Sequence, residues 1–167
     1  MTLINFTKIL IGVILFLTSI SSASADALGD YIQKHCKTNC VDAGLFRMVL
    51  YEIKEAHDID PVMMAAIVQV ESNFNTRAVN RTNGKSIGLS QIQVRWHTDK
   101  FITGHYHDVF DNVHVGAVVY RDCLKRHRGA VRKALWCYNG HQKTGMKRYV
   151  PKVLKSYHSL KKEGVRI

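Results

Sequence analysis

Three observations predict that the chain folds as one all-α domain, at most with a small appendage. Apolar residues recur every three or four positions, strand-like alternation is nearly absent, and neither internal repeats nor low-complexity segments are visible. A spacing of three to four residues places side chains on one face of a helix, whereas a strand alternates with a period of two. With 167 residues, 46% of them hydrophobic and only 2 Pro, the composition excludes disordered and collagen-like classes.

The first 25 residues are predicted to be a signal peptide. Lys8 precedes an apolar run over 9–20, which is shorter than the roughly 20 apolar residues of a membrane-spanning helix. The small residues over 21–25 then provide a small-x-small cleavage site. We therefore expect cleavage after Ala25 and an exported protein, either periplasmic or secreted. The alternative interpretation is an uncleaved membrane anchor.

The mature chain is expected to contain an N-terminal helical extension over 26–58 and a main domain over 59–167. Within the extension, five apolar residues at helical spacing predict an amphipathic helix from about Asp42 to His57. These residues are Leu45, Met48, Val49, Ile53 and Ala56. The extension is therefore expected to pack its apolar face on the main domain.

A second helix is predicted to begin at Asp60, a good N-cap, with Pro61 in the first helical position. Residues 62–70 are apolar on almost every face, so this helix must be buried. Glu71 ends it. Burial and the partial negative charge of the helix C-terminus both raise a carboxyl pKa, as a general acid requires. The alternative is a glutamate that turns to solvent as the helix ends.

The rest of the chain is predicted to contain one loop and four further helices. Polar residues over 72–86 indicate an irregular loop, and a short helix is expected over 89–96. Apolar residues at helical spacing predict the other helices around 113–124, 131–135 and 146–160.

The four cysteines of an exported chain predict two disulfides. Three pairings are possible, and we favour Cys36 with Cys40 and Cys123 with Cys137. The second bridge would join two successive helices across a short loop and would stabilise the fold by about 3 kcal/mol.

A metal site is the competing interpretation of the cysteines. It would require His35, His105 or His107 to join the thiolates, and the sequence has no paired CxxC or HExxH spacing. We therefore expect neither a metal nor another cofactor.

Three motifs resemble those of the lytic transglycosylases related to goose-type lysozyme. The motifs are Glu71-Ser72-Asn73-Phe74-Asn75, Gly88-Leu89-Ser90-Gln91-Ile92 and Tyr138-Asn139-Gly140, with Tyr149-Val150 following. Their order and spacing match over about 59–153, and several linked motifs are far more specific than any one of them. The chain departs from the family at Ser90, Cys137 and Gly140-His141, where the usual residues are Met, Ala and Ala-Gly.

The resemblance implies a lysozyme-like helical domain that cleaves the β-1,4 bond between N-acetylmuramic acid and N-acetylglucosamine in peptidoglycan. Glu71 matches the family's single catalytic acid, and the implied product ends in a 1,6-anhydro sugar. Peptidoglycan glycan strands are thus the expected partner, and a cell-envelope secretion or assembly apparatus is a further candidate.

The resemblance also implies a set of substrate-binding residues. Gln91 would hydrogen-bond a sugar, and the hydroxyl of Tyr138 would orient Glu71. Asn80, Thr82 and Ser86 lie in the loop where the family places polar groups near the substrate's N-acetyl group. Tyr149 would line the same cleft.

Two other functions fit parts of the sequence. A goose-type lysozyme would hydrolyse the same bond, with Asp99, Asp108 or Asp111 activating a water molecule. A non-catalytic exported protein would instead bind anionic polymers through residues 121–167, which hold fourteen basic residues against Asp122 and Glu163. No nucleic-acid-binding motif is present, so nucleic acid is not expected as a partner.

Overall fold

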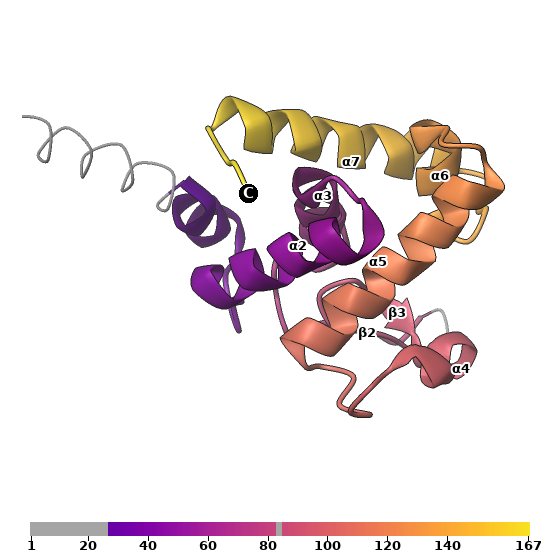
Figure 1. Ribbon diagram of the computed structural model, residues 1–167, viewed down its shortest axis with the longest axis horizontal. Coiled ribbons are helices and arrows are strands. Elements are labelled where there is room, and N and C mark those ends of the chain that lie inside the picture. The colour runs from indigo at the N-terminus through magenta and orange to yellow at the C-terminus, as the bar shows by residue number, and fades with distance from the viewer. Residues whose placement is uncertain (1–26, 83–84) are drawn as a thin grey trace, which may run out of the picture.

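A computed structural model describes residues 27–82 and 85–167 (Figure 1). The predicted signal peptide and its cleavage site after Ala25 lie outside these residues. Within the described part of the chain, we found no helix with both the length and the apolar character needed to cross a bilayer.

The described residues are mostly helical, and the all-α prediction is confirmed apart from one small sheet. A helix covers 27–35, and it is followed by α2 (Ala43–His57), α3 (Pro61–Ser72), α4 (Val94–His97), a 3₁₀ turn (Thr98–Lys100), α5 (Val109–Arg126), α6 (Val131–Tyr138) and α7 (Gly145–Lys162). In Figure 1, α3 lies at the centre, with α7 along one side of it and α2 and α5 on the other.

Helix α3 is the buried centre of the fold, as its apolar sequence predicts. The Asp60 side chain accepts hydrogen bonds from the backbone N–H groups of Val62 and Met63, which caps the helix. Every residue from Pro61 to Gln69 is buried. The helix ends at Asn73, which adopts the left-handed conformation and donates its N–H to the Gln69 carbonyl. Glu71 therefore lies in the last turn of a helix that the core holds in place.

The N-terminal helix over 27–35 and helix α2 belong to the same hydrophobic core as α3. Leu28, Tyr31 and Ile32 are buried in that core. The hydroxyl of Tyr31 donates a hydrogen bond of 2.9 Å to Gln69 Oε1, which lies on α3. The predicted extension thus contacts the helix that carries Glu71.

Residues 89–96 do not form the short helix expected from the sequence. They contribute instead to a three-stranded antiparallel sheet in the order β1 (Val79–Asn80), β2 (Ser86–Ile87) and β3 (Ile92–Gln93), and α4 begins only at Val94. Gly88 and Gln91 both have a positive φ, of 75° and 49°. These conformations cannot continue a right-handed helix, and they turn the chain so that β3 pairs with β2.

The side chain of Asn112, on α5, holds this turn in place. Its Oδ1 accepts the N–H of Ser90 at 2.7 Å, and its Nδ2 donates to the carbonyls of Ile87 and Tyr106 at 2.9 and 2.8 Å. A Cβ atom at Gly88 would lie 2.4 Å from Asn112 Nδ2. Glycine is therefore required at position 88 both for its conformation and for this close approach.

The structure contains the two disulfides that the sequence favoured. Cys36 is joined to Cys40, directly after the N-terminal helix, and Cys123 is joined to Cys137. The second bridge links α5 to α6 across the turn between them.

Candidate active site

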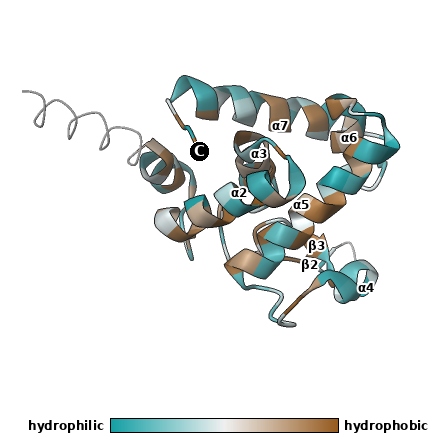
Figure 2. Ribbon diagram, in the orientation of Figure 1, coloured by the Kyte–Doolittle hydropathy of each residue, from teal (hydrophilic) through white to brown (hydrophobic). Residues whose placement is uncertain are grey.

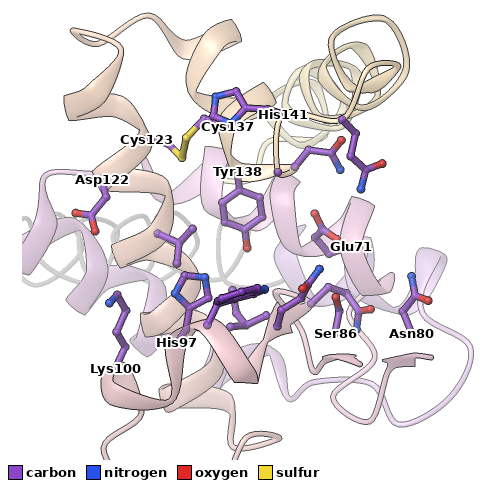
Figure 3. A pocket seen from close by; sticks show the side chains of 18 of the residues that line it. Glu71, Asn80, Ser86, His97, Lys100, Asp122, Cys123, Cys137, Tyr138 and His141 are labelled. Carbon is purple, nitrogen blue, oxygen red and sulfur yellow. A yellow bond between two sulfur atoms is a disulfide. The ribbon is translucent and has the colours of Figure 1, made fainter. Parts of the chain in front are cut away.

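Glu71 opens onto a cleft of about 720 Å³ between the small sheet, α4, α5 and α6 (Figure 3). The side of the cleft at the sheet is lined by Asn80, Ser86 and Gln91, and the opposite side by Tyr138 and the loop that follows α6. Two segments of the chain, the sheet with α4 and the α5–α6 pair, thus meet at the end of α3, which carries this carboxyl group.

The carboxyl group of Glu71 is held by a tyrosine of α7. The hydroxyl of Tyr149 donates a hydrogen bond of 2.6 Å to Glu71 Oε1. Burial raises the pKa of Glu71 from 4.5 to about 7, and the Tyr149 hydrogen bond opposes part of this rise because it stabilises the carboxylate. At neutral pH the carboxyl group can therefore both donate and accept a proton.

Tyr138 lines the cleft beside Glu71, but its hydroxyl donates to the backbone carbonyl of Ser90 at 2.8 Å. Burial, together with the charge of Glu71, keeps the pKa of Tyr138 well above its usual value. The hydroxyl bonded to Glu71 is that of Tyr149, which is buried and is not among the residues lining the cleft. The geometry thus places the two tyrosines differently from the sequence expectation, which had Tyr138 orienting the acid and Tyr149 lining the cleft.

Gln91 lines the cleft with its side chain anchored to the turn. Its Nε2 donates to the carbonyls of Ala78 and Gly88 at 3.2 and 3.0 Å. Asn80 and Ser86 also line the cleft, whereas Thr82 is exposed and is not among the lining residues. The Thr82 backbone N–H donates to Asn80 Oδ1 at 3.0 Å. The structure thus brings five of the predicted site residues to the cleft: Glu71, Asn80, Ser86, Gln91 and Tyr138.

The acids considered for a water-activating role do not line the cleft. Asp99 is exposed and pairs with Lys100, and Asp108 caps α5 by accepting the N–H of Asp111. Asp111 is buried and accepts hydrogen bonds from Thr103 and from the N–H of Ile102. Each of these carboxylates has a structural partner.

Asp122 is the second carboxylate among the described residues that line the cleft. It is exposed and forms an ion pair with Arg121 at 3.4 Å. In Figure 3 it lies on the far side of Tyr138 from Glu71. The cleft therefore brings no second carboxylate beside Glu71.

The other end of the cleft contains residues that the sequence did not single out. Trp96 of α4 is 66% exposed there, and the Arg95 guanidinium lies 4.9 Å from the centre of its ring. His97 and Lys100 line the cleft next to α4, and Arg126 lines it near Cys137, 4.0 Å from the Cys137 sulfur. One sequence signal could have pointed to Trp96. It is an aromatic residue within a polar segment, and such a segment does not provide a core in which to bury it.

One group of potential metal ligands is found within 27–82 and 85–167. Ligand atoms of His127, Cys137 and His141 lie within 4.8 Å of one another. The Cys137 sulfur is bonded to Cys123, so it is not a thiolate, and Arg126 Nη1 lies 4.0 Å from it. Two imidazoles beside a cationic side chain make a poor ligand set for a metal ion.

The model of the family described as "Transglycosylase SLT domain" matches residues 48–156 of the chain. This range includes Glu71, the small sheet and the α6 end of the cleft. No solved structure matches the chain significantly.

Proposed function

Because the chain belongs to the transglycosylase SLT domain family, which acts on peptidoglycan glycan strands, we propose that it is a lytic transglycosylase. In this proposal it cleaves the β-1,4 bond between N-acetylmuramic acid and N-acetylglucosamine and leaves a 1,6-anhydro end on the muramic acid.

The observation that carries the proposal is the state of Glu71. Its carboxyl group opens onto the cleft, and its pKa of about 7 leaves a large fraction protonated at neutral pH. A general acid is most effective when its pKa lies near the working pH. The same group, once deprotonated, remains stabilised by the Tyr149 hydrogen bond and can act as a base.

The proposed reaction uses Glu71 twice. Its proton moves to the glycosidic oxygen as the bond from that oxygen to C1 of the muramic acid breaks, and N-acetylglucosamine leaves as the alcohol. The carboxylate then takes the proton of the C6 hydroxyl, and the C6 oxygen forms a new bond to C1. Glu71 ends protonated, as it began, and no water is consumed.

The carboxylate arrangement supports this route. Ordinary glycosidases use two carboxylates separated by about 5 to 5.5 Å or about 6.5 to 9.5 Å, whereas substrate-assisted enzymes need only one. Among the described residues that line the cleft, none places a second carboxylate beside Glu71, since Asp122 lies beyond Tyr138. We propose that the substrate's N-acetyl oxygen stabilises the cationic C1, with Asn80 and Ser86 contacting that group.

Product analysis tests the proposal against the hydrolase alternative. Mass spectrometry of digested peptidoglycan should show anhydro-ended fragments, each lighter by one water molecule than the products of hydrolysis. Hydrated ends in the wild-type digest would instead identify a goose-type lysozyme. E71Q should lower turnover about 10²- to 10⁴-fold, and near-normal turnover in this variant would refute the role of Glu71.

We also propose that the protein acts outside the cytoplasm, periplasmic or secreted, after cleavage behind Ala25. The apolar run over 9–20 and the two disulfides support export, because structural disulfides persist in oxidising compartments. Amino-terminal sequencing of the exported protein should begin at Asp26. An intact amino terminus would identify a membrane anchor instead.

A further inference from the structure

One face of α7 presents a row of cations to solvent. Arg148, Lys152, Lys155 and Lys162 follow one another at spacings of four, three and seven residues, and all are exposed. Residues separated in this way lie on one side of a helix. Arg148 and Lys162 are 14 residues apart, so the row extends over about 20 Å at about 1.5 Å per residue.

The opposite face of α7 anchors the helix to the core. Tyr149, Val150, Val153, Ser156 and Leu160 are buried there. Figure 1 shows α7 on the outside of the molecule with α3 beneath it, and Figure 2 shows hydrophobic and hydrophilic residues alternating along it. The cationic row therefore points away from the core on a rigid support.

The cations of this row have no acidic partner among the described residues. Helix α7 contains no Asp or Glu, and the ion pairs found between described residues are Lys34–Glu163, Lys100–Asp99 and Arg121–Asp122. The positive charges of the row therefore repel one another unless anions from outside the protein neutralise them.

We propose that this face of α7, which we call the basic face, docks the protein onto a bilayer that contains anionic phospholipids. A straight helix with cations along one side matches a plane of closely spaced phosphates, and basic residues near such a surface are attracted to it. None of the large hydrophobic residues exposed in the described chain belongs to α7. The association is therefore electrostatic and reversible, without insertion into the acyl chains.

The position of the basic face favours a membrane over the glycan substrate. No residue of α7 is among those lining the cleft, so a glycan strand in the cleft does not lie along this row. A protein docked through α7 keeps the cleft open, which allows the enzyme to work on wall polymer next to the membrane. This consequence rests on the proposed function, whereas the docking itself does not.

Vesicle cosedimentation tests the proposal with the whole chain and the same amino terminus in every variant. The measured quantity is the difference in binding between vesicles that contain phosphatidylglycerol and vesicles of phosphatidylcholine alone. R148Q/K152Q/K155Q should lower that difference about 100-fold, because each basic residue contributes about a five-fold factor near an anionic surface. High salt should abolish it.

The matched control removes three exposed cations elsewhere. K37Q/K54Q/R77Q changes the net charge by the same amount on other elements and should retain binding. Equal losses in the two triple variants would show that net charge alone matters, and an unchanged R148Q/K152Q/K155Q would show that α7 is not involved. Either result overturns the proposal. So would a loss confined to duplex DNA binding, which would identify nucleic acid as the partner.

Two further measurements separate this proposal from the enzymatic one. Circular dichroism should show that both triple variants retain the wild-type helicity. Cleavage of soluble glycan fragments should be unchanged in R148Q/K152Q/K155Q, because these side chains lie outside the cleft. Loss of vesicle binding with intact cleavage supports docking by α7 independently of the reaction products.

Discussion

Tyr149 on α7 donates a 2.6 Å hydrogen bond to Glu71 at the end of α3, across 78 positions of sequence. This contact joins the outer helix of the molecule to the carboxyl group in the cleft. Burial raises the pKa of Glu71 to about 7, and the Tyr149 hydroxyl limits the rise by stabilising the carboxylate. The proton affinity of Glu71 therefore depends on how α7 packs against α3.

Replacing Tyr149 with Phe should raise the pKa of Glu71 above about 7, because the hydrogen bond that favours the carboxylate is lost. The basic limb of the pH–rate profile should move to higher pH. Turnover should fall about 10- to 100-fold, since a hydrogen bond to a charged group contributes about 1.5–3 kcal/mol. Tyr120→Phe provides a control, because Tyr120 is also a buried tyrosine, whereas the side-chain hydrogen bond to Glu71 comes from Tyr149. A basic limb that moves to lower pH in Tyr149→Phe would contradict the assignment.

The free energy of unfolding should decrease as the pH rises from about 4.5 to about 7, because Glu71 has a higher pKa in the folded chain than in the unfolded chain. Below pH 4.5 the carboxyl group is protonated in both the folded and the unfolded chain, so it contributes no pH dependence. Between its ordinary pKa of 4.5 and its folded pKa of about 7, the unfolded chain releases this proton first, which favours unfolding.

Glu71→Gln should therefore be more stable than the wild type above pH 7, by up to about 3 kcal/mol, and equal to it near pH 4. Urea denaturation at several pH values measures the difference. A difference that is constant with pH would mean that the folded pKa of Glu71 is close to 4.5.

The Cys123–Cys137 bridge should matter for activity more than the Cys36–Cys40 bridge. Cys123 and Cys137 both line the cleft, and Cys137 precedes Tyr138. Replacing this pair with Ala should cost about 3 kcal/mol of stability for a loop of this length and should lower turnover at temperatures where the protein remains folded. The matched variant, with Cys36 and Cys40 replaced by Ala, should retain turnover. Equal activities of the two variants would show that the cleft does not need the bridge.

Gly88→Ala should destabilise the fold and lower activity. The new Cβ would lie 2.4 Å from Asn112 Nδ2 and would displace the turn that carries Gln91. Gly104→Ala is the matched control, because Gly104 has a similar φ of 73° but nothing within 4 Å of the added atom. We expect a cost of about 1 kcal/mol for Gly104→Ala and about 3 kcal/mol for Gly88→Ala, measured by chemical denaturation. Equal costs would mean that Asn112 does not restrain the turn.

Local sequence signals were sufficient to locate most of the helices and to single out the candidate acid, but they wrongly predicted a helix over 89–96. The apolar run after Asp60-Pro61 predicted a buried helix, which left Glu71 either desolvated or turned to solvent at its end, and in the structure the carboxyl group is buried. The all-α class and the approximate positions of α2, α5, α6 and α7 followed from the same periodicity, although α5, α6 and α7 extend beyond their predicted ranges. The cysteine spacings favoured the pairing that the structure contains.

The sheet and the partner of Glu71 depend on contacts that local patterns do not encode. Each strand has two residues, too few for an alternating pattern, and the turn between β2 and β3 is held by Asn112 from a later helix. The packing of α7 on α3 decides that Tyr149, and not Tyr138, is the partner of Glu71. Tyr149 and Glu71 are 78 positions apart in the sequence, so no local pattern connects them. Trp96 carried only a weak signal, an exposed aromatic residue in a polar segment.

The protonation state of Glu71 can be measured directly by following its side-chain carboxyl ¹³C resonance with pH, assigned by its absence in Glu71→Gln. The structure predicts a titration midpoint at about pH 7. A midpoint near 4.5, the value of an exposed glutamate, would contradict the proposal that this carboxyl group serves as the general acid.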